Sequence, residues 1–232
     1  DDFTYYKNKN GQNKWQIPIV KPITYNNKEK LPIEPYLLGL CLGDGHIKDV
    51  SVKIDVHKDD FDELFVNQPI KETKPQKNLR SGSILLSESL KELKLNQTRS
   101  HNKFIPDIYK YSSIEDRLSI LQGLMDTDGH CIKSKKGNFT GTEFSSSSEQ
   151  LVDDVAEIVH SLGGIVRKKS RIPTYAYNGE KLKGKRNYRL NIKLPEGMNP
   201  FRLKRKSDEY KTPKKYKIGR YITDIKLEKQ GE

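Results

Sequence analysis

Apolar residues follow two different spacings along this chain, and the two spacings alternate. From Pro35 an apolar run continues to Gly45; proline suits the first turn of a helix and glycine its end. Residues 50–56 then alternate between apolar and polar side chains, which predicts a strand with one buried face. The inward residues of this strand are expected to be Val50, Val52, Ile54 and Val56.

The same order of spacings begins again in the second half of the chain. Ile114 to Asp128 carries an apolar stripe at helical spacing, and a hairpin turn is expected at residues 135–138. Ser146 and Glu149 form a capping-box pattern ahead of a second helix. The remaining predicted elements are strands at 15–20 (docked on a core), 83–86, 165–172, 188–194 and 220–227, and a helix capped by Asp59 that carries Phe61, Leu64 and Phe65. Helix, strands, helix and strands therefore occur twice, which indicates an α+β protein with an internal duplication.

Charge is unevenly distributed over the 232 residues. The chain carries a net charge of +12, but residues 167–220 contain 19 Lys and Arg against 4 Asp and Glu. A positive field concentrated in this way suits a polyanion, and nucleic acid is the commonest polyanion inside cells. No apolar run approaches membrane-helix length, the start at Asp1 does not resemble a secretion signal, and two cysteines show no metal or disulfide spacing. We therefore expect an intracellular protein, cytoplasmic or nucleoid-associated, with no membrane partner.

Each half opens with an apolar helix that ends in Asp-Gly, at Asp44 in the first half and Asp128 in the second. Small residues spaced four apart precede each aspartate, and residues at this spacing share one helix face. Small side chains on such a face allow two helices to approach closely. If the helices lie side by side, both aspartates emerge together. The small residues are Gly39 and Gly43 in the first half and Gly123 and Thr127 in the second.

Two carboxylates at two helix C-termini repel each other, because each C-terminus also carries about half a negative charge. Divalent cations would remove this conflict. Carboxylate oxygens and exposed last-turn carbonyls are the hard ligands that Mg²⁺ prefers. The candidate metal ligands are therefore Asp44, Asp128 and the carbonyls of Gly43 and Thr127. Metal held there can activate water for phosphodiester hydrolysis.

Residues 37–45, Leu-Leu-Gly-Leu-Cys-Leu-Gly-Asp-Gly, and residues 121–129, Leu-Gln-Gly-Leu-Met-Asp-Thr-Asp-Gly, resemble the paired signature of LAGLIDADG homing endonucleases. The preceding Leu31–Tyr36 resembles the intein-borne branch. The resemblance implies a monomer built as a pseudo-twofold pair of αββαββα subdomains, with antiparallel sheets that form a DNA-binding saddle in the major groove. It implies that the final aspartates bind Mg²⁺ (or Mn²⁺) over the minor groove and that both strands are cut with short 3′ extensions. In the first copy Leu42 stands where the second has Asp126, a position that is not a metal ligand in this family.

The resemblance also divides the chain. The subdomains would span residues 31–110 and 111–200, between an N-terminal arm at 1–30 and a basic tail at 201–232. Trp15–Tyr25 and Gly219–Ile225 are similar to pieces of an intein splicing domain. Splicing needs a Cys or Ser at the first residue and a terminal His-Asn, whereas this chain begins with Asp and ends with Glu. We expect that the chain as it stands does not splice.

The family uses basic residues near the scissile phosphates, which implies two candidate catalytic lysines. Lys103 lies in a segment resembling the family's lysine-containing block before Ile-Pro, 59 residues after Asp44. Lys185 lies 57 residues after Asp128, a nearly symmetric position, and its closest rival is Arg186. A lysine there would orient the attacking water or stabilise charge on the phosphorane.

Strand alternation also predicts which residues face DNA. Asn and Arg have the bidentate geometry for adenine and guanine edges, whereas lysines mostly meet phosphates. Tyr188, Leu190 and Ile192 are expected to face inward. The predicted outward, DNA-binding residues are Ser51 and Lys53 in the first half and Arg167, Lys169, Arg171, Arg189, Asn191 and Lys193 in the second.

The sequence thus favours a Mg²⁺-dependent, site-specific double-strand DNA endonuclease that acts on a long asymmetric target. Two alternatives stay open: an RNA maturase of the same fold, and a DNA-binding regulator that does not cleave. Retention of Asp44 and Asp128 argues against both, because binding alone does not require the two carboxylates.

Overall fold

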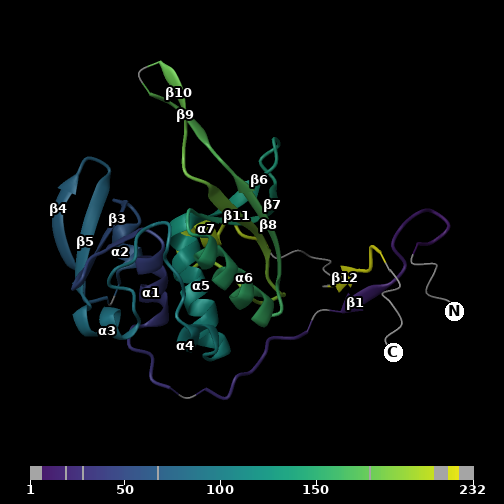
Figure 1. The fold of residues 1–232 in the computed structure, drawn as a ribbon, viewed down its shortest axis with the longest axis horizontal. Helices are drawn as coiled ribbons and strands as arrows, with labels where there is room; N and C mark the ends of the chain where they lie inside the picture. The colour runs from purple at the N-terminus through teal and green to yellow at the C-terminus, as the bar shows by residue number, and fades with distance from the viewer. Residues whose placement is uncertain are drawn as a thin grey trace, which may run out of the picture.

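The computed structural model describes residues 7–18, 20–27, 29–66, 68–177, 179–211 and 219–224. Within them the chain forms a mixed α+β fold with two four-stranded antiparallel sheets (Figure 1). The first half contains α1 (Pro35–Leu42), β2 (Gly45–Ile47), β3 (Ser51–His57), α2 (Phe61–Leu64), β4 (Lys71–Gln76), β5 (Leu79–Leu85), α3 (Ser87–Glu92) and α4 (Asp107–Lys110). The second contains α5 (Ile114–Asp128), β6 (Gly129–Lys133), β7 (Phe139–Ser146), α6 (Glu149–Ser161), β8 (Ile165–Arg171), β9 (Thr174–Tyr177), β10 (Glu180–Lys183), β11 (Asn187–Lys193) and α7 (Lys204–Ser207).

The two halves share one topology. The first sheet has the strand order β2-β3-β5-β4 and the second β6-β7-β11-β8, so each strand of the first sheet has an equivalent in the second. Helices α1 and α5 precede the equivalent hairpins, and α2 and α6 separate them. The predicted internal duplication and the αββαββα order are confirmed.

Helices α1 and α5 lie at the centre, between the two sheets in Figure 1. All eight residues of α1 are buried, which explains why this segment reads as continuously apolar and not as amphipathic. Ser113 begins α5: its hydroxyl accepts a hydrogen bond from the Asp116 amide at 3.0 Å and donates one to the Asp116 carboxylate at 2.8 Å. The central helices therefore carry most of the contact between the halves.

Strand alternation identifies the buried face of each sheet. Val52 and Ile54 are fully buried on β3 of the first sheet, and Leu190 is fully buried on β11 of the second. The prediction that Val50 also faces inward is wrong. Its side chain is 49% exposed, because β3 begins only at Ser51 and Val50 belongs to the turn after β2.

Several predicted element boundaries are also wrong. Helix α1 is capped by Gly43, and Gly45 begins β2 instead of ending the helix. Asp60, not Asp59, precedes α2, which is only one turn long. Ser148, not Ser146, caps α6 by accepting from the Leu151 amide at 3.2 Å.

The strand predicted near the N-terminus does form, but it is not docked on a core. Strand β1 (Gln16–Pro18) pairs with β12 (Gly219–Tyr221) in a separate two-stranded sheet at the right-hand edge of Figure 1. Trp15 is 47% exposed and Ile17 59%. Ile19 and the predicted strand residues 225–227 lie outside the described residues. Across the described part of the chain, no helix is both long and apolar enough to cross a bilayer.

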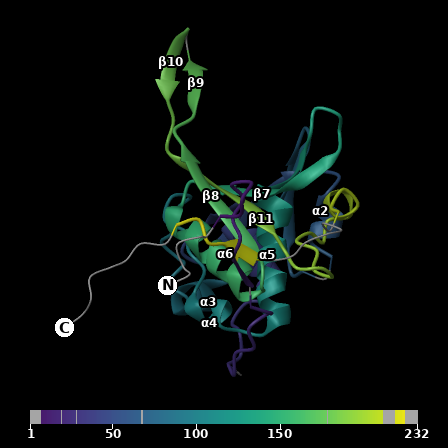
Figure 2. The same cartoon turned by 90° about the vertical axis from the view of Figure 1, so that its right-hand side faces the viewer.

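Strands β9 and β10 form a hairpin that the sequence did not predict. It continues β8 and β11 beyond the sheet and projects from the body in both views (Figures 1 and 2). The equivalent hairpin of the first half, β4–β5, spans residues 71–85, whereas β8–β11 spans 165–193. The second half therefore carries the longer arm.

Candidate active site

Small residues bring α1 and α5 into backbone contact. A Cβ added at Gly39 would lie 2.9 Å from the Cα of Gly123, and one added at Gly43 would lie 2.7 Å from the Cβ of Thr127. Neither distance leaves room for a side chain. The predicted side-by-side packing of the two helices is confirmed, and it places their C-terminal ends together.

This packing brings together Asp44, at the end of α1, and Asp128, at the end of α5. Asp44 is exposed and Asp128 is half-buried. Neither carboxylate accepts a hydrogen bond from the residues that the structure describes. Although Asp44 reaches solvent, the protein atoms around it raise the pKa of its carboxylate, and the charge of Lys103 opposes this rise. Burial, and then the negative charge of Asp44, raise the pKa of Asp128 to about 7.

Two open pockets lie at these helix ends. One, of about 560 Å³, is lined by Asp44, Lys103 and Lys185 among others. The other, of about 300 Å³, is lined by Asp128, Lys103 and Asn187 among others. Gly43 and Lys103 line both pockets, so the two pockets adjoin each other at the helix ends.

Lys103 caps the end of α1. It is only 6% exposed, and its ammonium group donates to the carbonyls of Gly43 and Gly45, each at 2.8 Å. A cation at a helix C-terminus offsets the negative end of the helix dipole. Burial lowers the pKa of Lys103, and the charges of Asp128 and Asp44 raise it. The structure thus brings Lys103 to the site, as the family resemblance implied.

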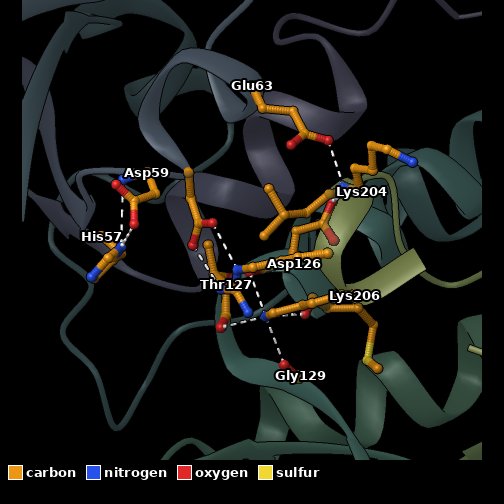
Figure 3. Close-up of polar contacts among 12 residues, drawn as sticks. His57, Asp59, Glu63, Asp126, Thr127, Gly129, Lys204 and Lys206 are labelled. Carbon is orange, nitrogen blue, oxygen red and sulfur yellow. Dashed lines mark hydrogen bonds and ion pairs between the residues drawn. The ribbon is translucent and has the colours of Figure 1, made fainter. Parts of the chain in front are cut away.

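Lys185 does not occupy the equivalent position in the second half; Lys206 does. The Lys206 ammonium group donates to the carbonyls of Asp126 at 2.6 Å and Gly129 at 2.7 Å, with longer contacts to Met125 and Thr127 (Figure 3). Lys206 is 8% exposed, whereas Lys185 is an exposed residue on the Asp44 side. The proposed symmetry between Lys103 and Lys185 is therefore wrong. Its rival Arg186 is exposed too, and donates to the Ser170 hydroxyl at 3.3 Å.

The cause of this error is visible in the fold. Lys206 lies 78 residues after Asp128, against 59 for Lys103 after Asp44. The extra hairpin β9–β10 lies within that interval. The spacing found in the first half, counted from Asp128, therefore ends before α7 begins. The sequence feature that could have identified Lys206 is its place in a basic segment after the last strand of the second sheet. This segment belongs to the predicted tail that begins at residue 201.

Asp126 connects α1, α5 and α7. Its Oδ2 atom accepts hydrogen bonds from the Tyr36 hydroxyl at 2.8 Å and from the amides of Arg202 and Leu203 at 3.0 Å. Burial raises the pKa of this carboxylate, and these hydrogen bonds oppose the rise. Leu42, the equivalent residue of the first copy, is fully buried. The aspartate at this position therefore holds the segment that carries Lys206.

The donor set at the helix ends suits a hard divalent cation. Neither carboxylate accepts a hydrogen bond from the described residues. Burial is the main cause of their raised pKa values, and a cation would favour the ionised form of both. The predicted carbonyl ligands of Gly43 and Thr127 already accept hydrogen bonds from lysines, at 2.8 and 3.3 Å, although each carbonyl retains a second lone pair. Within the described ranges no three His, Cys, Asp or Glu residues cluster as a metal site. The metal would therefore depend on two carboxylates, with backbone and solvent oxygens.

The predicted DNA-binding residues of the second half share one face of its sheet. Register pairs Arg189 with Lys169 and Asn191 with Arg167, and paired residues of antiparallel strands point to the same side. Arg167, Lys169, Arg171 and Lys193 are exposed. Arg189 and Asn191 are half-buried, and both contact the Glu143 carboxylate at 3.1 Å.

The corresponding face of the first sheet is less basic. Lys53 lies on it and forms an ion pair with Asp55 at 3.1 Å, and Ser51 is half-buried at its edge. Leu85, which pairs with Ser51, is 79% exposed. The two outward faces therefore have the same position in their halves but different chemistry.

Part of the chain also matches a known protein family. Residues 115–192, which run from α5 to β11, match the family model of a LAGLIDADG-like domain. No curated protein matches the sequence significantly.

Solved structures of two homing endonucleases match parts of this chain. A structure of mesophilic variants of I-DmoI is 17% identical, with a TM-score of 0.43, over 70% of this chain and 89% of that one. I-SmaMI bound to uncleaved DNA in the presence of calcium ions is 12% identical, with a TM-score of 0.34, over 69% of this chain and 79% of that one. I-SmaMI bound to cleaved DNA gives 12% identity and a TM-score of 0.36, over 73% of this chain and 79% of that one.

Proposed function

We propose that this protein is a site-specific double-strand DNA endonuclease that requires Mg²⁺ or Mn²⁺. The observation that carries the proposal is the pairing of Asp44 and Asp128 at the ends of two helices in backbone contact. A buried lysine caps each of these helix ends. The match of residues 115–192 to a LAGLIDADG-like domain supports the same class.

Asp44 and Asp128 would hold the metal, with the carbonyls of Gly43 and Thr127 nearby. A bound divalent ion would supply activation of a water nucleophile and neutralisation of charge on the phosphate. The charges of Lys103 and Lys206 oppose the raised pKa of both aspartates, which favours the ionised carboxylates that a cation would bind. Each lysine also fixes the last turn from which one aspartate projects.

The outward sheet faces would receive the duplex. Arg189 and Asn191 present groups that match guanine and adenine edges, while Arg167, Lys169 and Arg171 provide phosphate contacts. Because the two faces differ chemically, one chain would read a long asymmetric target as a monomer. We propose that each half cuts one strand and that the cuts leave short 3′ extensions, with Lys103 and Lys206 as the catalytic lysines and Lys185 as a phosphate contact beside Asp44.

The subdomain limits 31–110 and 111–200, and the intein-borne origin of the segments that flank them, are also proposals. They are supported by the resemblance of Leu31–Tyr36 and of the flanking segments to that branch. An enzyme of this kind would act on DNA inside the cell, in the cytoplasm or at the nucleoid.

Cleavage selection from duplexes with a long randomised region tests the activity and identifies the target sequence in one experiment. We expect wild-type protein to enrich and cut one sequence in Mg²⁺ but not in chelator. Asp44→Asn and Asp128→Asn should each reduce cutting by roughly 10²-fold or more while DNA binding in Ca²⁺ persists. Cutting that survives these changes or the chelator would refute the mechanism. Binding without cutting in Mg²⁺ would indicate a regulator, and a preference for folded RNA a maturase.

A further inference from the structure

Each buried lysine of the candidate site is anchored by a helix of the opposite half. Lys206 lies in α7, which follows the second half, but α7 contacts α2 of the first half. Arg205 forms a two-pronged ion pair with Asp60, its Nε atom 2.7 Å from Oδ1 and its Nη2 atom 2.6 Å from Oδ2. The amide of Lys204 donates to the Glu63 carboxylate at 2.5 Å (Figure 3).

The first half shows the mirror arrangement. The carbonyl of Lys103 accepts a hydrogen bond from the Ser148 hydroxyl at 2.6 Å. The amide of Ile105 donates to the Asp154 carboxylate at 2.8 Å. Ser148 caps α6 and Asp154 lies within it, and α6 is the second-half equivalent of α2. The anchoring is therefore reciprocal between the halves.

The Asp60–Arg205 pair differs from an ordinary surface ion pair. The Asp60 side chain is only 8% exposed, and forked Arg–carboxylate geometry is the strong form of this interaction. The hydrogen bonds from Arg205 are the main cause of the lowered pKa of Asp60. By contrast, Lys204 and Asp208 in the same helix form a pair that is 76% and 63% exposed. Such exposed pairs contribute little.

We propose that Asp60 is a positioning residue for Lys206, so that α2 of the first half controls the centre built on the second half's aspartate. Asp60 holds Arg205, and Arg205 fixes the turn of α7 from which Lys206 reaches the end of α5. Ser148 does the same for Lys103 from the other side. The cutting of each DNA strand is thus controlled by a residue from the half of the protein that does not supply the aspartate for that cut. This inference rests on the proposed endonuclease function.

Strand-resolved cleavage tests the proposal. The probe is a duplex selected from a randomised library by the wild-type protein, with a different fluorophore on each strand. We expect Asp60→Asn to slow cutting of one strand by roughly tenfold or more and to accumulate a nicked product, because a misplacement of about 1 Å at a reacting centre costs up to about 10²-fold. Ser148→Ala should slow the other strand.

Two further variants separate positioning from loss of charge or stability. Arg205→Lys keeps the charge but cannot form the fork, so it should reproduce the strand bias of Asp60→Asn. Lys204→Ala removes one cation from the same helix and should cut both strands at the wild-type rate. Affinity for the probe in Ca²⁺ should change little in Asp60→Asn, and cleavage is compared at a temperature at which both proteins are fully folded.

Equal slowing of both strands by Asp60→Asn, or no slowing at all, would overturn the inference. So would a bias toward the same strand in Asp60→Asn and Ser148→Ala. If Asp60→Asn does not fold, the strand bias of Arg205→Lys tests the proposal in its place. A wild-type protein that cuts neither strand of any library member would instead refute the proposed function, which keeps the two failures distinct.

Discussion

Gly39→Ala tests the contact on which the site depends. The added Cβ would lie 2.9 Å from the Cα of Gly123 and from the amide nitrogen of Leu124, where ordinary contact begins at 3.4 Å. It would lie closer still to the carbonyl oxygen of Ile120. All three atoms are backbone, so no side-chain rotation relieves the overlap, and the helices must separate by about 1 Å.

The expected cost has two parts. Overpacking of this kind costs about 1–3 kcal/mol, which lowers the melting temperature of a chain this size by roughly 2–12 °C. The same displacement moves Asp44 away from Asp128, and a shift of about 1 Å at a reacting centre reduces the rate by about 10²-fold. Thermal denaturation and cleavage of a selected duplex measure the two parts separately.

Gly141→Ala is the matched control, because no atom lies within 4 Å of a Cβ added there. It should leave both the melting temperature and cleavage close to wild type. A Gly39→Ala protein that is indistinguishable from Gly141→Ala in both measurements would show that α1 and α5 do not meet as described.

Three further predictions follow from the site. Because the pKa of Asp128 is raised to about 7, the metal-free protein should lose stability as pH rises from about 4 to 7, and Mg²⁺ should raise the melting temperature more at pH 8 than at pH 6; equal Mg²⁺ shifts at both pH values would contradict this. Replacing Pro173–Gly184 by a two-residue turn should weaken DNA binding and lower its salt dependence by about one ion, while the melting temperature stays unchanged; an unaltered salt slope would exclude the hairpin from the interface. Tyr36→Phe should cost about 1–3 kcal/mol in denaturant unfolding, because the buried Asp126 carboxylate loses a donor; a neutral result would mean that water replaces the hydroxyl.

The local pattern of apolar and polar residues was sufficient to predict those structural features that depend only on residues close together in sequence. The alternation of Val52 and Ile54 and the apolar stripe of α5 are set by the periods of strand and helix, and both appear in the structure. The glycines four apart predicted a close helix contact, because only the absence of side chains permits it. Boundaries were less well predicted. Val50 continues the apolar alternation but lies in the turn before β3, and Ser146 and Ser148 are both possible caps for α6, since polar residues so close in sequence compete for one cap.

The duplicated order of elements, the pairing of Asp44 with Asp128 and the basic character of the second sheet could all be predicted from the amino-acid sequence. These features are encoded in spacing and composition over short stretches. By contrast, the folded protein was needed to show that Lys206 is the counterpart of Lys103 and that Asp60 contacts Arg205, 145 residues away. Spacing does not encode such contacts, because an inserted hairpin changes the sequence separation while the packed helices keep the geometry.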